Sequence, residues 1–189
     1  MKKRRIILGM SGASGQIYGI RMLEVLKAMG NVETHLVVTD WACKTIALET
    51  EYKIPYLESL ADYCYDINNL GAAISSGSFP CDGMIVLPCS IKTLSAIANS
   101  FNENLLIRAA DVTLKEKRPL ILAVRETPLH LGHLRIMIAA AEIGATIFPP
   151  VPAFYNQPGS INDLVINTVS KILDILGVKN NLCKKRWGE

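Results

Sequence analysis

Short apolar runs alternate with amphipathic segments along almost the whole sequence, and this alternation limits the possible fold more than any other feature. We expect strands at the apolar runs, which span residues 5–10, 33–39, 83–88, 119–124 and 145–148. Between them, apolar residues recur every three or four positions, which predicts helices over residues 16–29, 40–49, 91–99, 105–116, 131–143 and 161–176. Buried strands joined by helical crossovers are typical of parallel sheets with helices on both faces. The sequence therefore predicts an α/β fold with a three-layer, doubly wound parallel sheet, interrupted by a looser stretch over residues 50–82.

Length and composition agree with one globular unit. The chain has 189 residues, 50% of them apolar and 20% charged, which excludes disordered, collagen-like and coiled-coil proteins. No repeat or linker divides it, so we expect a single domain over residues 1–189 with a C-terminal tail from about 177. No apolar run approaches the ~20 residues of a membrane-spanning helix. The first apolar run breaks at Ser11-Gly12, too early for a signal peptide, and we expect a cytoplasmic protein.

The basic excess is confined to the ends of the chain. The formal net charge is +3, but residues 2–5 and 184–186 carry seven of the basic side chains. Without those seven and Glu189, 13 basic and 16 acidic residues remain. A nucleic-acid-binding face needs its basic residues clustered on the folded surface, so we do not expect this function. Five cysteines without a C-x-x-C pair predict reduced thiols rather than disulfides or a zinc site.

Ligands bind at the carboxyl ends of the strands in sheets of this kind, and four predicted strand ends are unusual. The first is the glycine-rich loop Gly9-Met-Ser-Gly-Ala-Ser-Gly15. Its spacing fits neither the dinucleotide motif nor the P-loop. We expect the following helix to offer its N-terminal amides to a phosphate-bearing ligand, with Ser11 and Ser14 as further donors. The alternative is a plain tight turn.

The second and third strand ends carry hydroxyl groups. Asp40 follows the second strand and could hold a ribose or cap the next helix; we favour the cap. Ser90 and Thr93 begin the helix after the third strand, which predicts a cradle for a phosphorylated cofactor. Cys89 could be a nucleophile at this helix start, but without a placed histidine a buried packing role is favoured.

The fourth strand end, Val124-Arg-Glu-Thr-Pro128, is charged. Arg125 is a candidate anion-binding fork and Glu126 a candidate proton carrier, unless the two merely form a surface ion pair. His130 and His133 have a spacing that could suggest a metal, but no matching carboxylate accompanies them, so capping or surface roles are favoured and we expect no metal site.

Two further features leave a choice open. Arg108, Asp111 and Lys115 share one face of a predicted helix, either as part of an anion site or as a salt-bridged surface. The stiff segment 148–155 ends at Tyr155 and could wall an apolar pocket or pack against a neighbouring subunit.

Seven motifs, in this order along the chain, resemble those of the flavin prenyltransferase family, the small partners of the ubiquinone-pathway and aromatic-acid decarboxylases. The resemblance runs from about residue 6 to 171 and reaches residues 186–189. The motifs are G-M-S-G-A-S-G, H-L-V-V-T, S-S-G-S-F, P-C-S-I-K-T-L-S, R-A-A-D-V-T-L-K-E, V-R-E-T-P-L-H-L-G-H-L and P-P-V-P-A-F-Y-N-Q-P.

The resemblance implies a Rossmann-like or flavodoxin-like flavoprotein. It implies a homo-oligomer, commonly a dodecamer, with FMN sites between subunits. It also implies an enzyme that joins the dimethylallyl group of dimethylallyl phosphate to N5 and C6 of reduced FMN. The prenylated FMN then serves a separate decarboxylase.

The same resemblance assigns roles to individual residues. FMN-binding positions match Gly12, Ala13, Ser14, Thr39, Ser90, Ile91, Lys92, Thr93 and Arg125. Donor-binding positions match Arg108, Lys115, Tyr155, Lys171 and Trp187, and the polar groups around the reacting flavin match Ser14, Glu49 and Glu126. Position 171 often holds arginine in relatives; lysine keeps the charge but not the bidentate fork.

Two other functions remain open at this point. One is an FMN-dependent decarboxylase acting on cysteinyl substrates; such flavoproteins carry a catalytic histidine where this chain has Trp41-Ala-Cys-Lys-Thr. The other is a non-catalytic flavin carrier subunit of an aromatic-acid decarboxylase.

Overall fold

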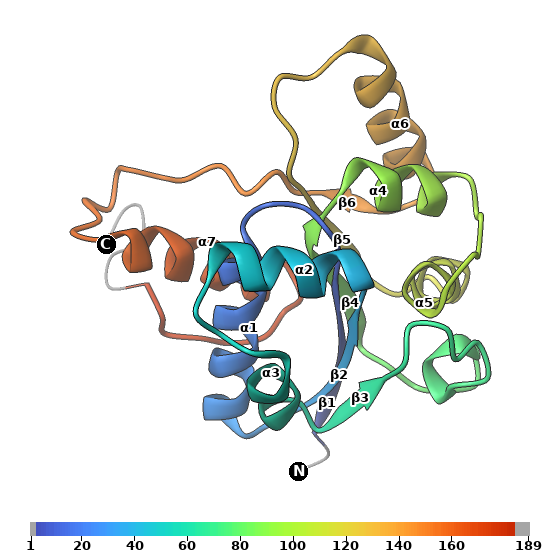
Figure 1. Ribbon diagram of the computed structural model, residues 1–189, viewed down its shortest axis with the longest axis horizontal. Helices are drawn as coiled ribbons and strands as arrows, with labels where there is room; N and C mark the ends of the chain where they lie inside the picture. Colours follow the sequence, from blue (N-terminus) through green and yellow to red (C-terminus); the bar gives the residue numbers. More distant parts are fainter. Residues whose placement is uncertain (1–2, 184–189) are drawn as a thin grey trace.

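The computed structural model describes residues 3–183, in which six parallel strands form one central sheet (Figure 1). The strands are β1 (Arg4–Met10), β2 (Val32–Val38), β3 (Tyr63–Tyr65), β4 (Gly83–Cys89), β5 (Leu120–Val124) and β6 (Thr146–Ile147). They lie in the order β3-β2-β1-β4-β5-β6, so the winding direction reverses between β1 and β4. The predicted doubly wound parallel sheet is confirmed, and its switch point is the place where such folds bind ligands.

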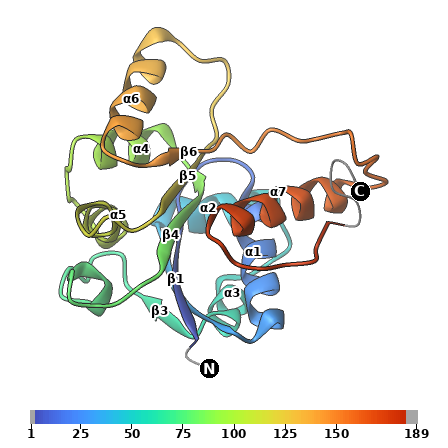
Figure 2. The ribbon, with the colours of Figure 1, turned by 180° about the vertical axis from the view of Figure 1, so that it is seen from behind.

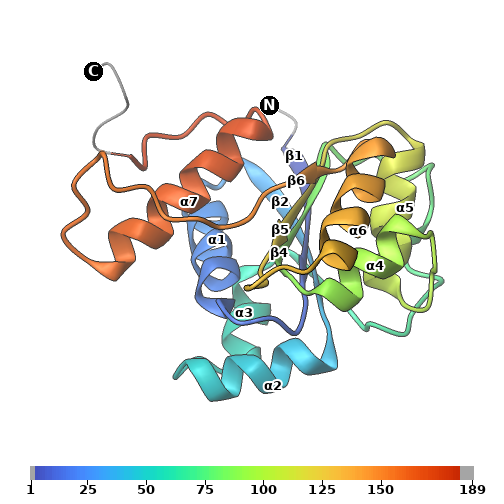
Figure 3. The ribbon, with the colours of Figure 1, turned by 90° about the horizontal axis from the view of Figure 1, so that it is seen from above.

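Helices cover both faces of the sheet, as the view from above shows (Figure 3). One face carries α1 (Gln16–Met29), α2 (Asp40–Glu49), α3 (Ile54–Leu60) and α7 (Ile161–Ile175). The other face carries α4 (Ile91–Ala98), α5 (Leu105–Lys115) and α6 (Leu131–Glu142). The view from behind shows α7 lying beside α1, far from α5 (Figure 2).

The strands β1, β4 and β5 are largely apolar because they are buried on both faces. Ile6 and Leu8 of β1 pack into the core beneath α1 and α7, whereas Ile7 packs into the core beneath α4 and α5. All three side chains are at most 1% exposed. Burial on both faces explains why the sequence shows continuous apolar runs rather than alternation.

The stretch over residues 50–82 is more ordered than the sequence predicts. It contains α3, β3 and one turn of 3₁₀ helix, η1 (Ala73–Ser75). The strand β3 escapes prediction because it lies at the sheet edge, where Tyr63 and Cys64 are exposed and leave no buried apolar run. Within residues 3–183, no helix is both long and apolar enough to cross a bilayer. All five cysteines are free thiols.

Candidate functional site

A cleft of about 490 Å³ opens at the carboxyl ends of the central strands. The loops after β1 and β3, the starts of α2 and α4, and the segment before α5 form its walls. Its lining residues are Gly12, Thr39, Asp40, Trp41, Ile67, Asn68, Ser90, Lys92, Thr93, Glu103 and Asn104. Five of them are among the nine positions that the family resemblance assigns to FMN, so the fold brings together more than half of that set.

Two capped helix starts face this cleft. The Thr39 hydroxyl caps α2 by accepting a hydrogen bond from the Ala42 amide at 3.2 Å. The Ser90 hydroxyl caps α4 by accepting from the Thr93 amide at 3.3 Å and also donates to the Thr93 hydroxyl at 3.1 Å. The cap that we expected from Asp40 is therefore made by Thr39, and Asp40 is the first residue of α2. Two positive helix ends and several hydroxyl groups make the cleft suited to a phosphate.

The loop after β1 lies very close to the start of α2. A Cβ atom added to Gly12 would lie 2.5 Å from the Cβ atom of Trp41. The indole of Trp41 is 65% exposed and carries the Lys44 ammonium 4.3 Å from its ring centroid. Glycine at position 12 therefore lets the loop and helix meet, and it leaves a flat aromatic side chain at the cleft wall.

At the end of the glycine-rich loop, the helix-start amides that we expected to face an external anion have a partner within the chain. Glu49 Oε2 accepts hydrogen bonds from the amides of Gly15 at 2.8 Å and Gln16 at 3.2 Å, so a carboxylate of the chain itself occupies the start of α1. Ser11, which we expected as a further donor, likewise has its partners within the chain. Its buried hydroxyl donates to the Pro88 carbonyl and accepts from the Ser90 amide, tying the loop to the end of β4.

The remaining predicted FMN positions surround the cleft rather than line it. Ala13 and Ser14 are partly buried in the loop after β1, and Ile91 is the first residue of α4. The Arg125 amide donates to the Cys89 carbonyl at 3.0 Å, which places the exposed Arg125 beside the start of α4. Cys89 itself is fully buried and burial raises the pKa of its thiol far above the ordinary value, in agreement with the packing role.

The rim of the cleft carries one ion pair. The Lys92 ammonium lies 3.1 Å from Glu103 Oε1, and the lysine side chain is 76% exposed. An exposed pair of this kind is worth little in stability, so Lys92 can exchange Glu103 for a ligand phosphate at low cost.

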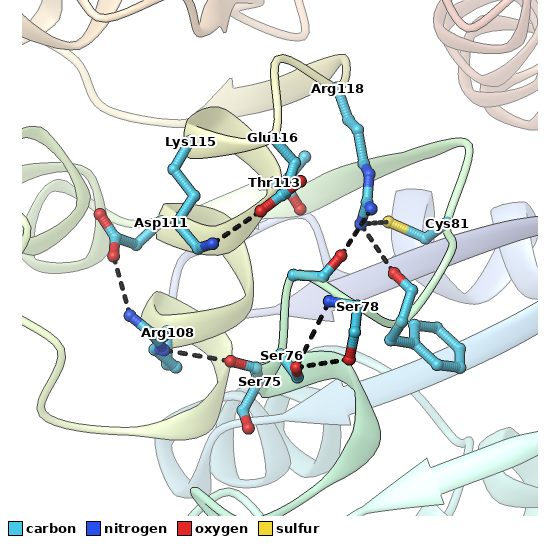
Figure 4. A network of polar contacts seen from close by, with 12 residues as sticks. Ser75, Ser76, Ser78, Cys81, Arg108, Asp111, Thr113, Lys115, Glu116 and Arg118 are labelled. Carbon is cyan, nitrogen blue, oxygen red and sulfur yellow. Dashed lines mark hydrogen bonds and ion pairs between the residues drawn. The ribbon is translucent and has the colours of Figure 1, made fainter.

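A second polar cluster lies further along α5, one turn beyond its N-cap Asn104 (Figure 4). Arg108 binds Asp111 at 3.2 Å and donates from Nε to the Ser75 carbonyl at 3.2 Å. Lys115 pairs with Glu116 at 2.7 Å, and this contact lowers the pKa of the Glu116 carboxyl. These residues face the turn that follows η1. The helix α5 therefore begins at the cleft and carries a separate group of cations further along its length.

Other predicted residues lie elsewhere. Lys171 is exposed on α7, on the opposite face of the sheet from α5, and Tyr155 is 53% exposed in the segment before α7. Glu126 is exposed after β5 and accepts from the Thr127 amide. Trp187 lies outside the described residues. One chain therefore does not bring Lys171 to Arg108 and Lys115.

The histidine pair has the capping role that we favoured. His130 is the N-cap of α6, and its Nδ1 accepts from the His133 amide at 3.3 Å. Over residues 3–183, no group of three histidine, cysteine or carboxylate side chains is arranged to hold a metal ion.

Sequence reasoning missed several cleft residues. Ile67, Asn68, Glu103 and Asn104 come from loops whose approach to the strand ends depends on tertiary structure. Only Asn104 carried a recognisable signal, since asparagine before an apolar helical segment is a typical N-cap.

The parallel sheet, its switch point and a cleft suited to a phosphate are typical of nucleotide-binding proteins of the doubly wound class. The Flavoprotein family model matches residues 1–175, which makes the chain a flavoprotein of this class. Flavin prenyltransferase UbiX of Thauera aromatica is 62% identical over 170 residues, which cover 90% of this chain and 87% of that protein. The crystal structure of AnUbiX (PadA1) in complex with FMN and dimethylallyl pyrophosphate is 49% identical, with a TM-score of 0.95 and coverage of 99% and 98%.

A dodecameric FMN-dependent UbiX-like decarboxylase from Escherichia coli O157:H7 is also similar, at 45% identity, a TM-score of 0.94 and coverage of 97% and 100%. Taken with the family model, these matches show that the chain belongs to the flavin prenyltransferase family.

Proposed function

We propose that this protein is a flavin prenyltransferase that joins the dimethylallyl group of dimethylallyl phosphate to N5 and C6 of reduced FMN. The observation that carries the proposal is that two polar sites lie along α5, each suited to an anion. Asn104, the N-cap of α5, lines the hydroxyl-rich cleft. Arg108 lies one turn further along α5, in the second polar cluster. A reaction between two phosphorylated substrates needs two such places side by side.

The cleft supports the binding of FMN. Thr39, Ser90, Thr93 and Lys92 offer hydroxyl groups, helix-start amides and a positive charge to its phosphate. We assign Arg125 to the same phosphate, since a guanidinium provides a bidentate fork. Gly12, Ala13, Ser14 and Ile91 provide close backbone approach for the rest of the nucleotide. The reduced flavin supplies the nucleophilic N5 and C6 positions when it is bound.

The second cluster supports the binding of the allylic donor. The bond between the allylic carbon and the phosphate oxygen breaks more readily when the leaving phosphate is neutralised. Arg108 and Lys115 can provide that neutralisation, together with Tyr155 and Lys171. Trp187 and the flavin face would stabilise positive charge on the allyl group. The proton lost from C6 passes to Glu126, to Ser14 or to the released phosphate.

The position of Lys171 supports a site shared between subunits. Since α5 and α7 lie on opposite faces of the sheet, Lys171 of one copy would meet Arg108 and Lys115 of another. Exposed apolar side chains are available for such contacts: Leu131 (60%) and Ile138 (56%) on α6, with Val151 (75%) and Phe154 (66%) before α7. We therefore propose a homo-oligomer, as in the dodecameric relative, and a separate decarboxylase as the user of the product.

The mass of the flavin tests this function. Purified protein incubated anaerobically with reduced FMN and dimethylallyl phosphate should yield a flavin heavier by one C5H8 unit. The matched control omits the donor. An unchanged flavin mass would show that the reaction is wrong and would favour a passive flavin carrier. Release of carbon dioxide from a cysteinyl substrate would instead support an FMN-dependent decarboxylase.

A further inference from the structure

The turn that faces the cations of α5 is held at several points along its length (Figure 4). We call residues Ser75–Phe79 the serine loop. The Ser75 carbonyl accepts from Arg108 Nε at 3.2 Å, and the Phe79 amide donates to the Ser76 carbonyl at 3.2 Å, closing a tight turn. The hydroxyl groups of Ser76 and Ser78 lie 2.9 Å apart. The loop is therefore ordered and packs against the second polar cluster, which we call the donor cluster (Arg108, Asp111, Lys115 and Glu116).

Arg118 makes the contacts that hold this loop from the side of the α5 C-terminus. Its Nη2 donates to the Gly77 carbonyl at 2.9 Å, and its Nη1 donates to the Phe79 carbonyl at 2.8 Å. Nη1 also lies 3.5 Å from the Cys81 sulfur. A planar guanidinium can bind two carbonyls in a fixed geometry, which an ammonium group cannot do. One side chain thus orients the Gly77–Ser78 and Phe79–Pro80 peptide groups.

Gly77, whose carbonyl accepts from Arg118, also lies close to the lysine of the donor cluster, Lys115. A Cβ atom added to Gly77 would lie 2.7 Å from Lys115 Nζ and 2.1 Å from Glu116 Oε1. The backbone of the serine loop is therefore packed directly against the Lys115–Glu116 pair. A shift of the loop by a fraction of an ångström would change the space in which the Lys115 ammonium can lie.

We propose that Arg118 is a positioning residue for the donor-phosphate site: by binding the Gly77 and Phe79 carbonyls, it holds the serine loop against Lys115 and Arg108. The inference rests on the proposed function, because it assigns the donor phosphate to this cluster. Arg118 acts through the loop and not by contact with the reacting atoms. Because the carbonyl partners of Arg118 are neutral, they do not cancel its positive charge. That charge therefore adds to the attraction for the donor phosphate.

The test compares Arg118→Ala and Arg118→Lys with wild type in steady-state kinetics and in calorimetric titration of the FMN-loaded protein with dimethylallyl phosphate. In Arg118→Ala we expect the donor KM and Kd to rise about tenfold, which corresponds to ~1.4 kcal/mol. The Kd for FMN should change by less than about twofold, whereas a tenfold change would correspond to ~1.4 kcal/mol. Arg118→Lys should recover little, since it restores the charge without the fork. Ethylguanidinium added at millimolar concentration should restore donor binding in Arg118→Ala.

The matched control is Lys117→Gln, which removes an exposed positive charge next to Arg118. It should leave the donor KM unchanged. A donor Kd in Arg118→Ala equal to that of wild type would overturn the positioning role, even with an active wild-type enzyme. The positioning role would also be overturned if Arg118→Ala lost FMN affinity and thermal stability together and ethylguanidinium did not restore its donor binding. If wild type binds the donor but forms no adduct, while Arg118→Ala binds it weakly, the proposed reaction is wrong and the positioning role stands. If wild type binds no donor, both proposals are wrong.

Discussion

Glu49 Oε2 lies 2.8 Å from the backbone nitrogen of Gly15, so the last residue of α2 closes the start of α1. The same oxygen accepts from the Gln16 amide. A negative charge at a helix N-terminus is favourable because it meets unpaired amides and the positive end of the helix dipole. The contact also holds the preceding residues, Gly12 to Ser14, at the edge of the cleft.

Replacing Glu49 should therefore affect both stability and FMN binding. Glu49→Ala leaves two amides without their carboxylate, and we expect a loss of about 1 kcal/mol in the free energy of unfolding. Glu49→Gln keeps an acceptor and should lose roughly half of that, since only the charge is removed. Urea titration and FMN fluorescence quenching measure the two effects. Glu51→Ala, at an exposed position two residues further on, is the control and should resemble wild type.

Gly12 should tolerate no larger side chain. Alanine would place its Cβ atom 2.5 Å from the Cβ atom of Trp41, so the start of α2 would have to move. Because that helix start lines the cleft, FMN affinity should fall about tenfold or more, a cost of at least ~1.4 kcal/mol. Gly71→Ala is the matched control, since the nearest atom there is Asn69 Oδ1 at 3.5 Å. Equal FMN affinity in the two variants would contradict the role given to Gly12.

Stability should fall as the pH drops from neutral because of His35. Its side chain is 2% exposed, with Nδ1 2.9 Å from the Tyr65 hydroxyl and Nε2 3.0 Å from Glu33. Burial lowers the pKa of His35 below 6.5, against the opposing effect of Glu33. The unfolded chain therefore binds a proton near pH 6.5 that the folded protein does not, and stability is lost as the pH falls below that value.

The measurement is the free energy of unfolding between pH 7 and pH 5 for wild type and His35→Gln. We expect the variant to be less stable at pH 7 but to show a smaller pH dependence. Glu33 responds in a lower range: burial raises its pKa, but hydrogen bonds from His35 and Arg5 lower it overall from 4.5. Its contribution is thus lost only as the pH falls below about 4.5. An identical slope in both proteins would exclude His35 as the cause.

The sequence predicts the helix and sheet layers and the cleft better than it predicts the second polar cluster, because the former depend on local patterns and the latter on contacts between distant segments. Residues 16–29 and 40–49 were predicted as helices with their observed bounds, because local apolar periodicity and helix caps determine them. Ser90 and Thr93 were correctly placed at a helix start for the same reason. The partners of Glu49 and Arg118 are backbone groups distant in sequence, and no side-chain pattern reports such contacts.

Mixing two inactive variants tests whether subunits share the donor site. Lys115→Ala and Lys171→Ala should each be nearly inactive alone, because each removes one cation from the donor phosphate. If the two lysines of one site come from different copies, mixed oligomers contain some sites with neither change. Random exchange then restores roughly one quarter of the sites, given equivalent symmetric subunits. Prenylated flavin formed only after unfolding and joint refolding would support the shared site, and continued inactivity would argue for a site within one chain.

Asp111 should influence both binding places, in contrast to Arg118. Its Oδ2 accepts from Arg108 Nη1 at 3.2 Å and from Asn102 Nδ2 at 3.1 Å. Asn102 belongs to the segment that leads through Glu103 to Asn104 at the cleft, whereas Arg108 belongs to the donor cluster. Asp111→Asn keeps the shape but removes the charge that attracts both partners.

In Asp111→Asn we expect the donor KM and the FMN Kd to rise together, each by about threefold to tenfold, or ~0.7 to 1.4 kcal/mol. Kinetics with varied donor and direct FMN titration separate the two quantities. A change in the donor KM alone would show that Asp111 serves Arg108 only and does not connect the cleft with the donor site.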